Sequence, residues 1–111
     1  MRIAIDARYL NASHSALSQY CENLIEHLAK VDAENQYIVF IHNSFPKTLR
    51  LGDNFRVRKI WADPLSWRTL ASFHTQIERS RADIAHALYP IVPLRYAGRL
   101  MVTVHDLKPY L

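Results

Sequence analysis

Short apolar runs alternate with longer amphipathic segments along this chain. Residues 3–5 are apolar and end at Asp6, and residues 37–41 form a run of β-branched and aromatic side chains. Both runs are typical of buried strands. Between them, apolar residues recur at steps of three and four over residues 16–31. This spacing predicts an amphipathic helix.

The second half of the chain repeats the alternation. Residues 55–60 mix apolar and basic side chains, which favours an edge strand exposed on one face. After Pro64, apolar residues spaced over 67–77 predict a second helix, and residues 83–87 and 100–104 predict two more strands. The order β-α-β-β-α-β-β predicts an α/β fold, namely a three-layer α/β sandwich with a Rossmann-like, mostly parallel sheet.

Length and composition predict one domain over residues 1–111. The chain is 50% hydrophobic and 22% charged, as expected for a globular domain, and we find no repeat and no linker. The predicted strand at 100–104 lies close to Leu111, where an α/β domain would add another helix, so we expect an incomplete sheet. We expect the exposed side of this strand to drive self-association.

The amino terminus and the single cysteine favour the cytoplasm. Asp6 interrupts the start before a signal-peptide apolar region forms, and residues 37–41 are too short to cross a bilayer. Cys21 is the one cysteine, which fits a reducing compartment. Because it falls in the middle of the predicted helix near its apolar face, we expect a core thiol and not a nucleophile.

The scarcity of glycine excludes two nucleotide-binding motifs. The chain has two glycines, Gly52 and Gly98, and neither follows the first predicted strand. The dinucleotide fingerprint and the Walker A loop both need glycines there. No pair of residues has a recognised metal-ligand spacing. We therefore predict neither a bound cofactor nor a metal.

A basic stretch follows the second predicted strand. The net charge is +4, and five basic residues with one acid between them fall within residues 47–59, namely Lys47, Arg50, Arg56, Arg58 and Lys59. The stretch lacks the interleaved aromatic residues of a single-stranded nucleic-acid platform, so nucleic acid is not expected as a partner. Two interpretations stay open: a solvated strand and loop, or a weak surface for anionic lipid or phosphate that allows peripheral membrane contact.

Polar side chains gather where the predicted strands end. Ligands of open α/β sheets bind beyond the carboxyl ends of the strands. The residues at these ends are Asp6, Arg8, His42, Asn43, His86, His105 and Asp106. Taken alone, Asp6 is also explained as a cap of the next turn, and His42 as a satisfied residue of the rim. His86 and His105 are also explained as packed histidines bonded to backbone. Their clustering at one edge of the sheet indicates a binding site.

Three segments resemble a known enzyme family. Residues 1–10 read MRIAIDARYL, residues 82–86 read ADIAH, and residues 103–107 read TVHDL. In these segments the chain is similar to family-4 glycosyltransferases, the retaining enzymes of GT-B architecture. The resemblance is in register over nearly the whole chain, although residues 44–80 are generic. It implies the amino-terminal, acceptor-side domain of an enzyme that moves a sugar from a nucleotide-sugar donor to a glycan or lipid-linked acceptor, without a metal.

The resemblance also implies roles for individual residues. His105 would contact the reacting sugar, and Asp106 would fix the loop geometry or the tautomer of that histidine. Asp6, Arg8 and His86 would line the acceptor side of the cleft.

The chain departs from the family after its first strand. The family sequence G-I-G-R-Y is replaced by Ala16, Leu17, Ser18 and Gln19 followed by Tyr20. Both glycines and the arginine of this donor-phosphate loop are missing, which hinders close approach of the backbone to phosphate and removes a cation. The family's carboxy-terminal donor domain has no counterpart in these residues, so we expect the isolated chain to be inactive.

Two other functions stay open. The chain could be a non-catalytic binding or interaction module derived from the same fold, which the altered loop favours. It could also be a receiver domain of the response-regulator type with Asp63 as phosphoacceptor, although receiver domains place two acids at the end of the first strand and this chain has Asp6 alone there.

Overall fold

The computed structural model describes residues 1–8, 10, 16–46, 48–60, 75–88 and 98–102. Its elements, in chain order, are β1 (Arg2–Asp6), α1 (Ala16–Val31), β2 (Gln36–His42), β3 (Phe55–Ile60), β4 (Ile84–Ala87) and β5 (Leu100–Val102). Residues 75–79 form a further stretch of helix. The predicted strands and the first helix are confirmed, while the predicted helical residues 67–74 and strand residues 103–104 lie outside the described part of the chain.

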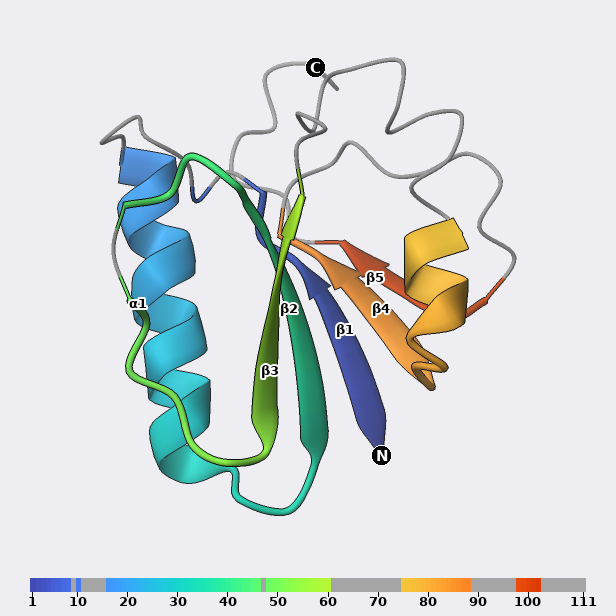
Figure 1. Cartoon of the computed structure of the whole chain (residues 1–111). Coiled ribbons are helices and arrows are strands. Elements are labelled where there is room, and N and C mark those ends of the chain that lie inside the picture. The colour runs from blue at the N-terminus through green and yellow to red at the C-terminus, as the bar shows by residue number, and fades with distance from the viewer. Residues whose placement is uncertain (9, 11–15, 47, 61–74, 89–97, 103–111) are drawn as a thin grey trace, which may run out of the picture.

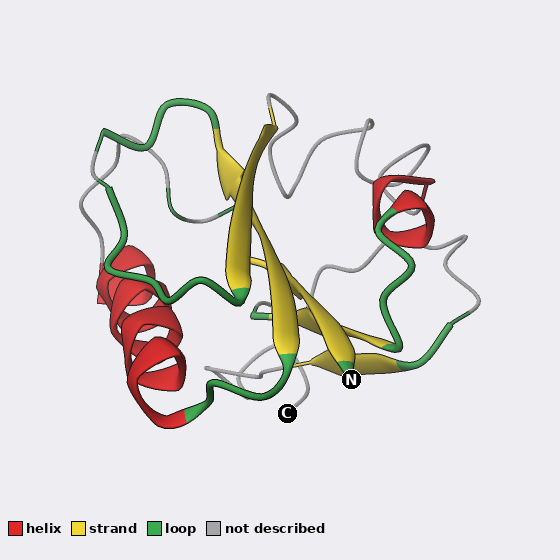
Figure 2. Ribbon diagram, turned by 60° about the horizontal axis from the view of Figure 1, so that its bottom comes forward, coloured by secondary structure: helices red, strands yellow, loops and turns green. Residues whose placement is uncertain are grey.

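The strands form a five-stranded sheet in the order β3-β2-β1-β4-β5, and every neighbouring pair is parallel. Helix α1 lies on one face of this sheet and the helical residues 75–79 lie on the other (Figures 1 and 2). The predicted α/β class with a Rossmann-like parallel sheet is therefore confirmed. Strand β3 lies at one edge, as its mixed apolar and basic sequence predicts.

Apolar side chains of the central strands fill a core on each side of the sheet. On the α1 face, Cys21 and Ile25 pack in one cluster with Val39. On the opposite face, Ile77 packs in a second cluster with Phe40. Because β2 is buried on both faces, it reads as a continuous apolar run and not as an alternation.

Cys21 is a core residue, as predicted. Its side chain is fully buried in the α1 cluster. Burial, together with the nearby negative charge of Asp6, raises the pKa of the Cys21 thiol to about 12. The thiol is therefore protonated at neutral pH and is a poor nucleophile.

A network of polar side chains closes the turn between α1 and β2. The Asp32 carboxylate accepts hydrogen bonds from Tyr37 Oη at 2.6 Å and from Asn35 Nδ2 at 2.8 Å. Asn54, just before β3, donates from Nδ2 to the backbone oxygens of Asp32 at 2.9 Å and Asn35 at 2.7 Å. The ring of Tyr37 stacks on that of Phe55, with centroids 4.3 Å apart. These contacts fix the amino-terminal ends of β2 and β3 side by side.

The same network shifts two pKa values. The hydrogen bond from Tyr37, with those from Asn35, holds the pKa of Asp32 well below its usual range. Burial and the neighbouring Asp32 raise the pKa of the Tyr37 hydroxyl to about 12. At neutral pH the bond therefore joins a phenol donor to a carboxylate acceptor.

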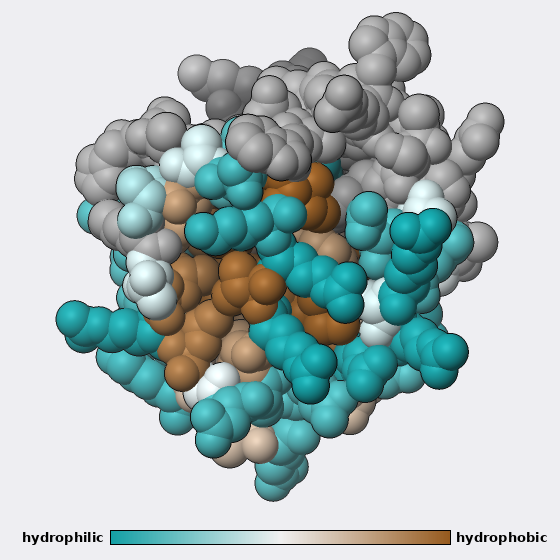
Figure 3. Space-filling model, viewed as in Figure 1, coloured by the Kyte–Doolittle hydropathy of each residue, from teal (hydrophilic) through white to brown (hydrophobic). Residues whose placement is uncertain are grey.

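The connection from β2 to β3 contains no helix in its described residues, 43–46 and 48–54. Two of its side chains, Phe45 and Leu49, are buried in the α1 cluster, so the connection covers the sheet beside α1. The outer surface of β3 is exposed from Arg56 to Lys59. Figure 3 shows hydrophilic side chains beside apolar ones on the face of the molecule on which β3 lies.

Candidate functional site

Three of the candidate residues lie at or just beyond the carboxyl ends of β1 and β4, which are neighbours in the sheet, namely Asp6, Arg8 and His86. From β1 the chain proceeds outward to β2 and β3, and from β4 it proceeds outward in the other direction to β5 (Figure 1). The boundary between β1 and β4 is thus the topological switch point of the sheet. Ligands of open α/β sheets bind beyond the carboxyl ends of the strands at such a point.

Backbone hydrogen bonds join the carboxyl ends of β1, β2 and β4 and the segment that follows β1. Ala7 N donates to Phe40 O at 2.8 Å, and His42 N donates to Leu10 O at 3.1 Å. On the other side, Leu88 N donates to the backbone oxygen of Asp6 at 3.3 Å. The carboxyl ends of β2, β1 and β4 are therefore joined into one rigid edge.

Asp6 and Arg8 form an ion pair at this edge. Arg8 donates from Nε to Asp6 Oδ1 at 2.8 Å and from Nη2 to Asp6 Oδ2 at 2.7 Å. The Arg8 side chain is 0% exposed and that of Asp6 is 10% exposed. Such two-pronged geometry is the strongest form of an arginine–carboxylate contact. The pair neutralises both charges beneath the surface of the edge.

His86 lies in β4, the strand paired with β1, one residue before the position that stands beside Asp6. In the register of the sheet it stands beside Ile5 of β1 and Met101 of β5. Its side chain is half-buried, and burial lowers the pKa of the imidazole below its ordinary value. At neutral pH His86 is therefore an uncharged ring with one donor and one acceptor nitrogen.

His42 ends β2 at the same edge and is held by its own turn. Its Nδ1 accepts a hydrogen bond from the backbone N–H of Ser44 at 3.1 Å and lies 2.7 Å from Ser44 Oγ. Since Nδ1 is an acceptor here, a neutral His42 carries its proton on Nε2. This fits the interpretation of His42 as a residue of the rim.

The residues predicted as a degenerate donor-phosphate loop form the first turn of α1. Ala16 and Gln19 are exposed, and Ser18 is buried. The turn has no acidic residue and no glycine. His105 and Asp106, predicted as catalytic, lie outside the described residues, as does Asp63.

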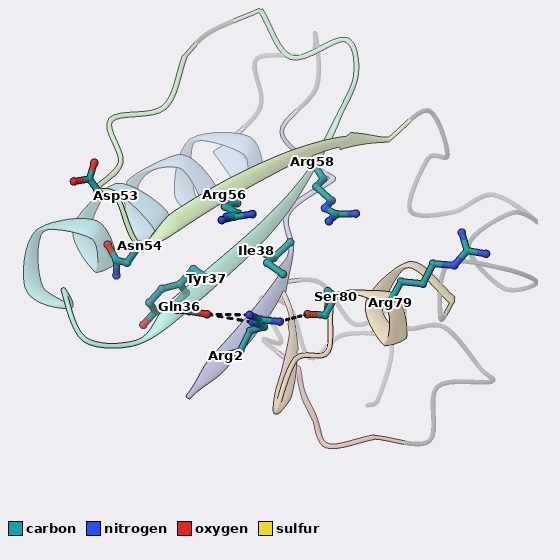
Figure 4. Close-up of a pocket in the computed structure, with 10 residues that line it drawn as sticks. All are labelled: Arg2, Gln36, Tyr37, Ile38, Asp53, Asn54, Arg56, Arg58, Arg79 and Ser80. Carbon is teal, nitrogen blue, oxygen red and sulfur yellow. Dashed lines mark hydrogen bonds between the residues drawn. The ribbon is translucent and has the colours of Figure 1, made fainter.

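A second feature was only partly visible in the sequence. A hollow of about 250 Å³ opens at the amino-terminal ends of β1, β2 and β3, on the face that carries the helical residues 75–79 (Figure 4). Four arginines line it, namely Arg2, Arg56, Arg58 and Arg79. The basic stretch at 47–59 contains two of them. The other two come from distant parts of the sequence, so no local sequence pattern indicates that the four arginines lie together.

No protein-family model, no curated protein and no solved structure matches this chain. Within the described residues, no group of three or more histidines, cysteines and carboxylates is placed to hold a metal ion. No helix in the described part of the chain is both long enough and apolar enough to cross a bilayer.

Proposed function

We propose that this chain is the acceptor-side, amino-terminal domain of a glycosyltransferase that moves a sugar from a nucleotide-sugar donor to a glycan or lipid-linked acceptor. The observation that supports the proposal is the position of Asp6 at the end of β1, Arg8 just beyond it and His86 in β4, on both sides of the switch point of a parallel sheet. Polar groups in this position are where an α/β sheet of this type binds its ligand.

The described residues support binding of a neutral, hydroxyl-rich ligand. The charges of Asp6 and Arg8 cancel, and burial keeps His86 uncharged by lowering its pKa. An uncharged edge with donors and acceptors suits a glycan better than a phosphate. In this proposal His105 contacts the reacting sugar, and Asp106 fixes the loop geometry or the tautomer of that histidine. Catalysis requires a donor-binding domain in addition to these residues.

The proposal places the protein in the cytoplasm, at the inner face of the membrane when its acceptor is lipid-linked. The buried free thiol of Cys21 supports a reducing compartment.

The experiment that tests the proposal is a binding screen. Fluorescently labelled oligosaccharides are titrated with the chain, and anisotropy is recorded for the wild type, His86→Gln and His27→Gln. His27 is exposed on α1 and belongs to neither β1 nor β4, so it serves as the matched control. We expect at least one glycan to bind the wild type and His27→Gln, with affinity reduced about tenfold in His86→Gln because the glutamine amide does not place its donor and acceptor where the imidazole nitrogens place theirs. Absence of binding to every glycan, or equal binding by His86→Gln, would refute the proposal.

A non-catalytic binding module is the second candidate. The observation in its favour is the first turn of α1, where Ala16 is exposed, Ser18 is buried and no glycine allows backbone to approach a diphosphate. Substituting both residues by glycine separates the candidates. The test is made in a chain that also carries a donor-binding domain. If the turn is a donor-phosphate loop, the variant binds a nucleoside diphosphate more tightly than its parent; if the chain is a binding module, its affinity for the nucleotide stays unchanged.

A further inference from the structure

The hollow at the amino-terminal ends of β1, β2 and β3 concentrates positive charge. Arg2, Arg56, Arg58 and Arg79 line it together with a single acid, Asp53 (Figure 4). In the close-up, Asp53 lies at the end of the hollow away from Arg79. The excess of cations therefore extends from β3 across to the helical residues 75–79.

Strand geometry explains why two of these arginines point into the same space. Arg56 and Arg58 are two residues apart on β3, so their side chains leave the same face of the sheet. They stand in register beside Ile38 and Phe40 of β2, which belong to the core cluster on the face opposite α1. Ile38 lines the hollow between them and Arg2.

Arg2 is held in position by its neighbours. Its Nη2 and Nε donate to Gln36 Oε1 at 3.1 and 3.3 Å, and its Nη1 donates to the backbone oxygen of Ser80 at 3.1 Å. Both partners, the Gln36 amide and the Ser80 carbonyl, are uncharged, so these bonds orient the Arg2 guanidinium without neutralising its charge. A guanidinium fixed in this way loses little conformational freedom when an anion binds.

The other three arginines have no such anchor. Among the described residues, no hydrogen bond or ion pair joins the guanidinium of Arg56, Arg58 or Arg79 to another group. Like charges facing one hollow repel one another, and an anion placed between them relieves that repulsion. The hollow is thus arranged for a ligand that carries more than one negative charge.

We propose that this hollow binds the phosphate group of a small phosphorylated molecule. Arginine presents a planar fork that matches phosphate oxygens, and cations from β1, β3 and residues 75–79 approach the hollow from different sides. The volume of about 250 Å³ is sufficient for a phosphomonoester. The site is separate from the switch point, which lies at the carboxyl ends of the strands, and it does not depend on the function proposed there.

The test uses glycerol 2-phosphate as the probe and glycerol as its uncharged counterpart. Binding is measured by calorimetry and by the rise in melting temperature of the wild type, Arg56→Gln/Arg58→Gln, and the control Arg50→Gln/Arg99→Gln. The control removes the same charge from exposed positions outside the hollow. We expect the phosphate ester alone to bind and stabilise the wild type and the control, and affinity to fall at least about tenfold in the hollow variant.

Vesicles that contain phosphatidylglycerol distinguish a pocket from a membrane-binding surface. In the proposal, glycerol 2-phosphate binds in the absence of vesicles and competes with any binding to them. Vesicle binding without binding of the soluble ester would overturn the proposal. So would equal losses in the hollow variant and the control, since a general effect of net charge would then explain the binding.

Discussion

Arg8 carries a full charge into the interior of the protein. Its side chain is 0% exposed, and the Asp6 carboxylate that accepts its hydrogen bonds is 10% exposed. A buried charge is tolerated only when it is paired. The sequence indicated that both residues lie at the end of the first strand, but their spacing could not show that they bind each other. That contact depends on the path of the backbone after Asp6.

Removal of Arg8 should therefore destabilise the fold strongly. We expect Arg8→Met to lower the free energy of unfolding by about 3–5 kcal/mol, because Asp6 is left buried without its cation. The double variant Asp6→Asn/Arg8→Met should regain part of this loss. Urea denaturation of both variants measures the effect. A loss below about 1 kcal/mol in Arg8→Met would contradict the burial of this pair.

His86 should make stability fall as the pH is lowered. Burial lowers its pKa in the folded state, so that the unfolded chain binds a proton at higher pH than the folded chain. Stability is therefore complete above about pH 6.5, the ordinary histidine value, and declines as the pH falls toward the lower folded pKa.

A pH series of urea denaturation tests this prediction. We expect the midpoint of the wild type to fall between about pH 7 and pH 5, and the fall to be smaller in His86→Gln. His27→Gln, which changes an exposed histidine, should follow the wild type. Identical slopes for wild type and His86→Gln would contradict the prediction. Asp32 affects stability in a separate pH range, because its pKa is lowered and it takes up a proton only at more acidic pH.

At the scale of elements, the sequence predicted most of what the structure describes. The predicted strand at 55–60 has the same bounds as β3, and the run at 37–41 is extended by one residue at each end in β2. The bounds of such strands are easy to predict, because the buried strand residues are apolar and the loops on either side are polar. The turn network around Asp32 was not predicted, since Asn54 reaches it from another loop.

This network makes Gly52 a sensitive position. A Cβ atom at residue 52 would lie 2.9 Å from Asn54 Oδ1, which is closer than van der Waals contact allows. Asn54 cannot turn away freely because its Nδ2 donates to the backbone oxygens of Asp32 and Asn35. We expect Gly52→Ala to cost about 1–2 kcal/mol of stability through these two bonds.

A double-mutant cycle with Asn54→Ala checks the cause. If the clash acts through Asn54, Gly52→Ala should cost much less in the Asn54→Ala background than in the wild type. Equal costs in the two backgrounds, measured by thermal unfolding, would show that the backbone at residue 52 and not Asn54 sets the penalty.

At the scale of the whole molecule, the order of the strands was beyond the reach of sequence. A parallel α/β sheet follows from the alternation of elements, but the order β3-β2-β1-β4-β5 fixes the switch point between β1 and β4. This order brings Asp6, Arg8 and His86 to one place. It also brings Arg2 and Arg79 to the hollow beside β3, which no pattern along the chain could indicate.

The same order predicts how molecules associate. In the described part of the chain, β5 has a neighbour on one side only, and its Leu100 and Met101 side chains are 38% and 51% exposed. We propose that the chain self-associates through this edge. Sedimentation should show a concentration-dependent rise in mass for the wild type and a smaller one for Met101→Lys. The matched substitution Val57→Lys, on the opposite edge strand, should leave the rise unchanged. A wild type that stays monomeric at high concentration would contradict this.

The central claim is that a glycan binds beyond the carboxyl ends of β1 and β4. The most direct test is a ¹H–¹⁵N correlation spectrum of the labelled chain, titrated with the oligosaccharide that binds best in the anisotropy screen. We predict that the amide signals of Asp6, Arg8, His86 and Leu88 shift, while those of Arg56 and Arg79 in the arginine-lined hollow stay in place. Shifts confined to the hollow, or none at the ends of β1 and β4, would contradict the claim.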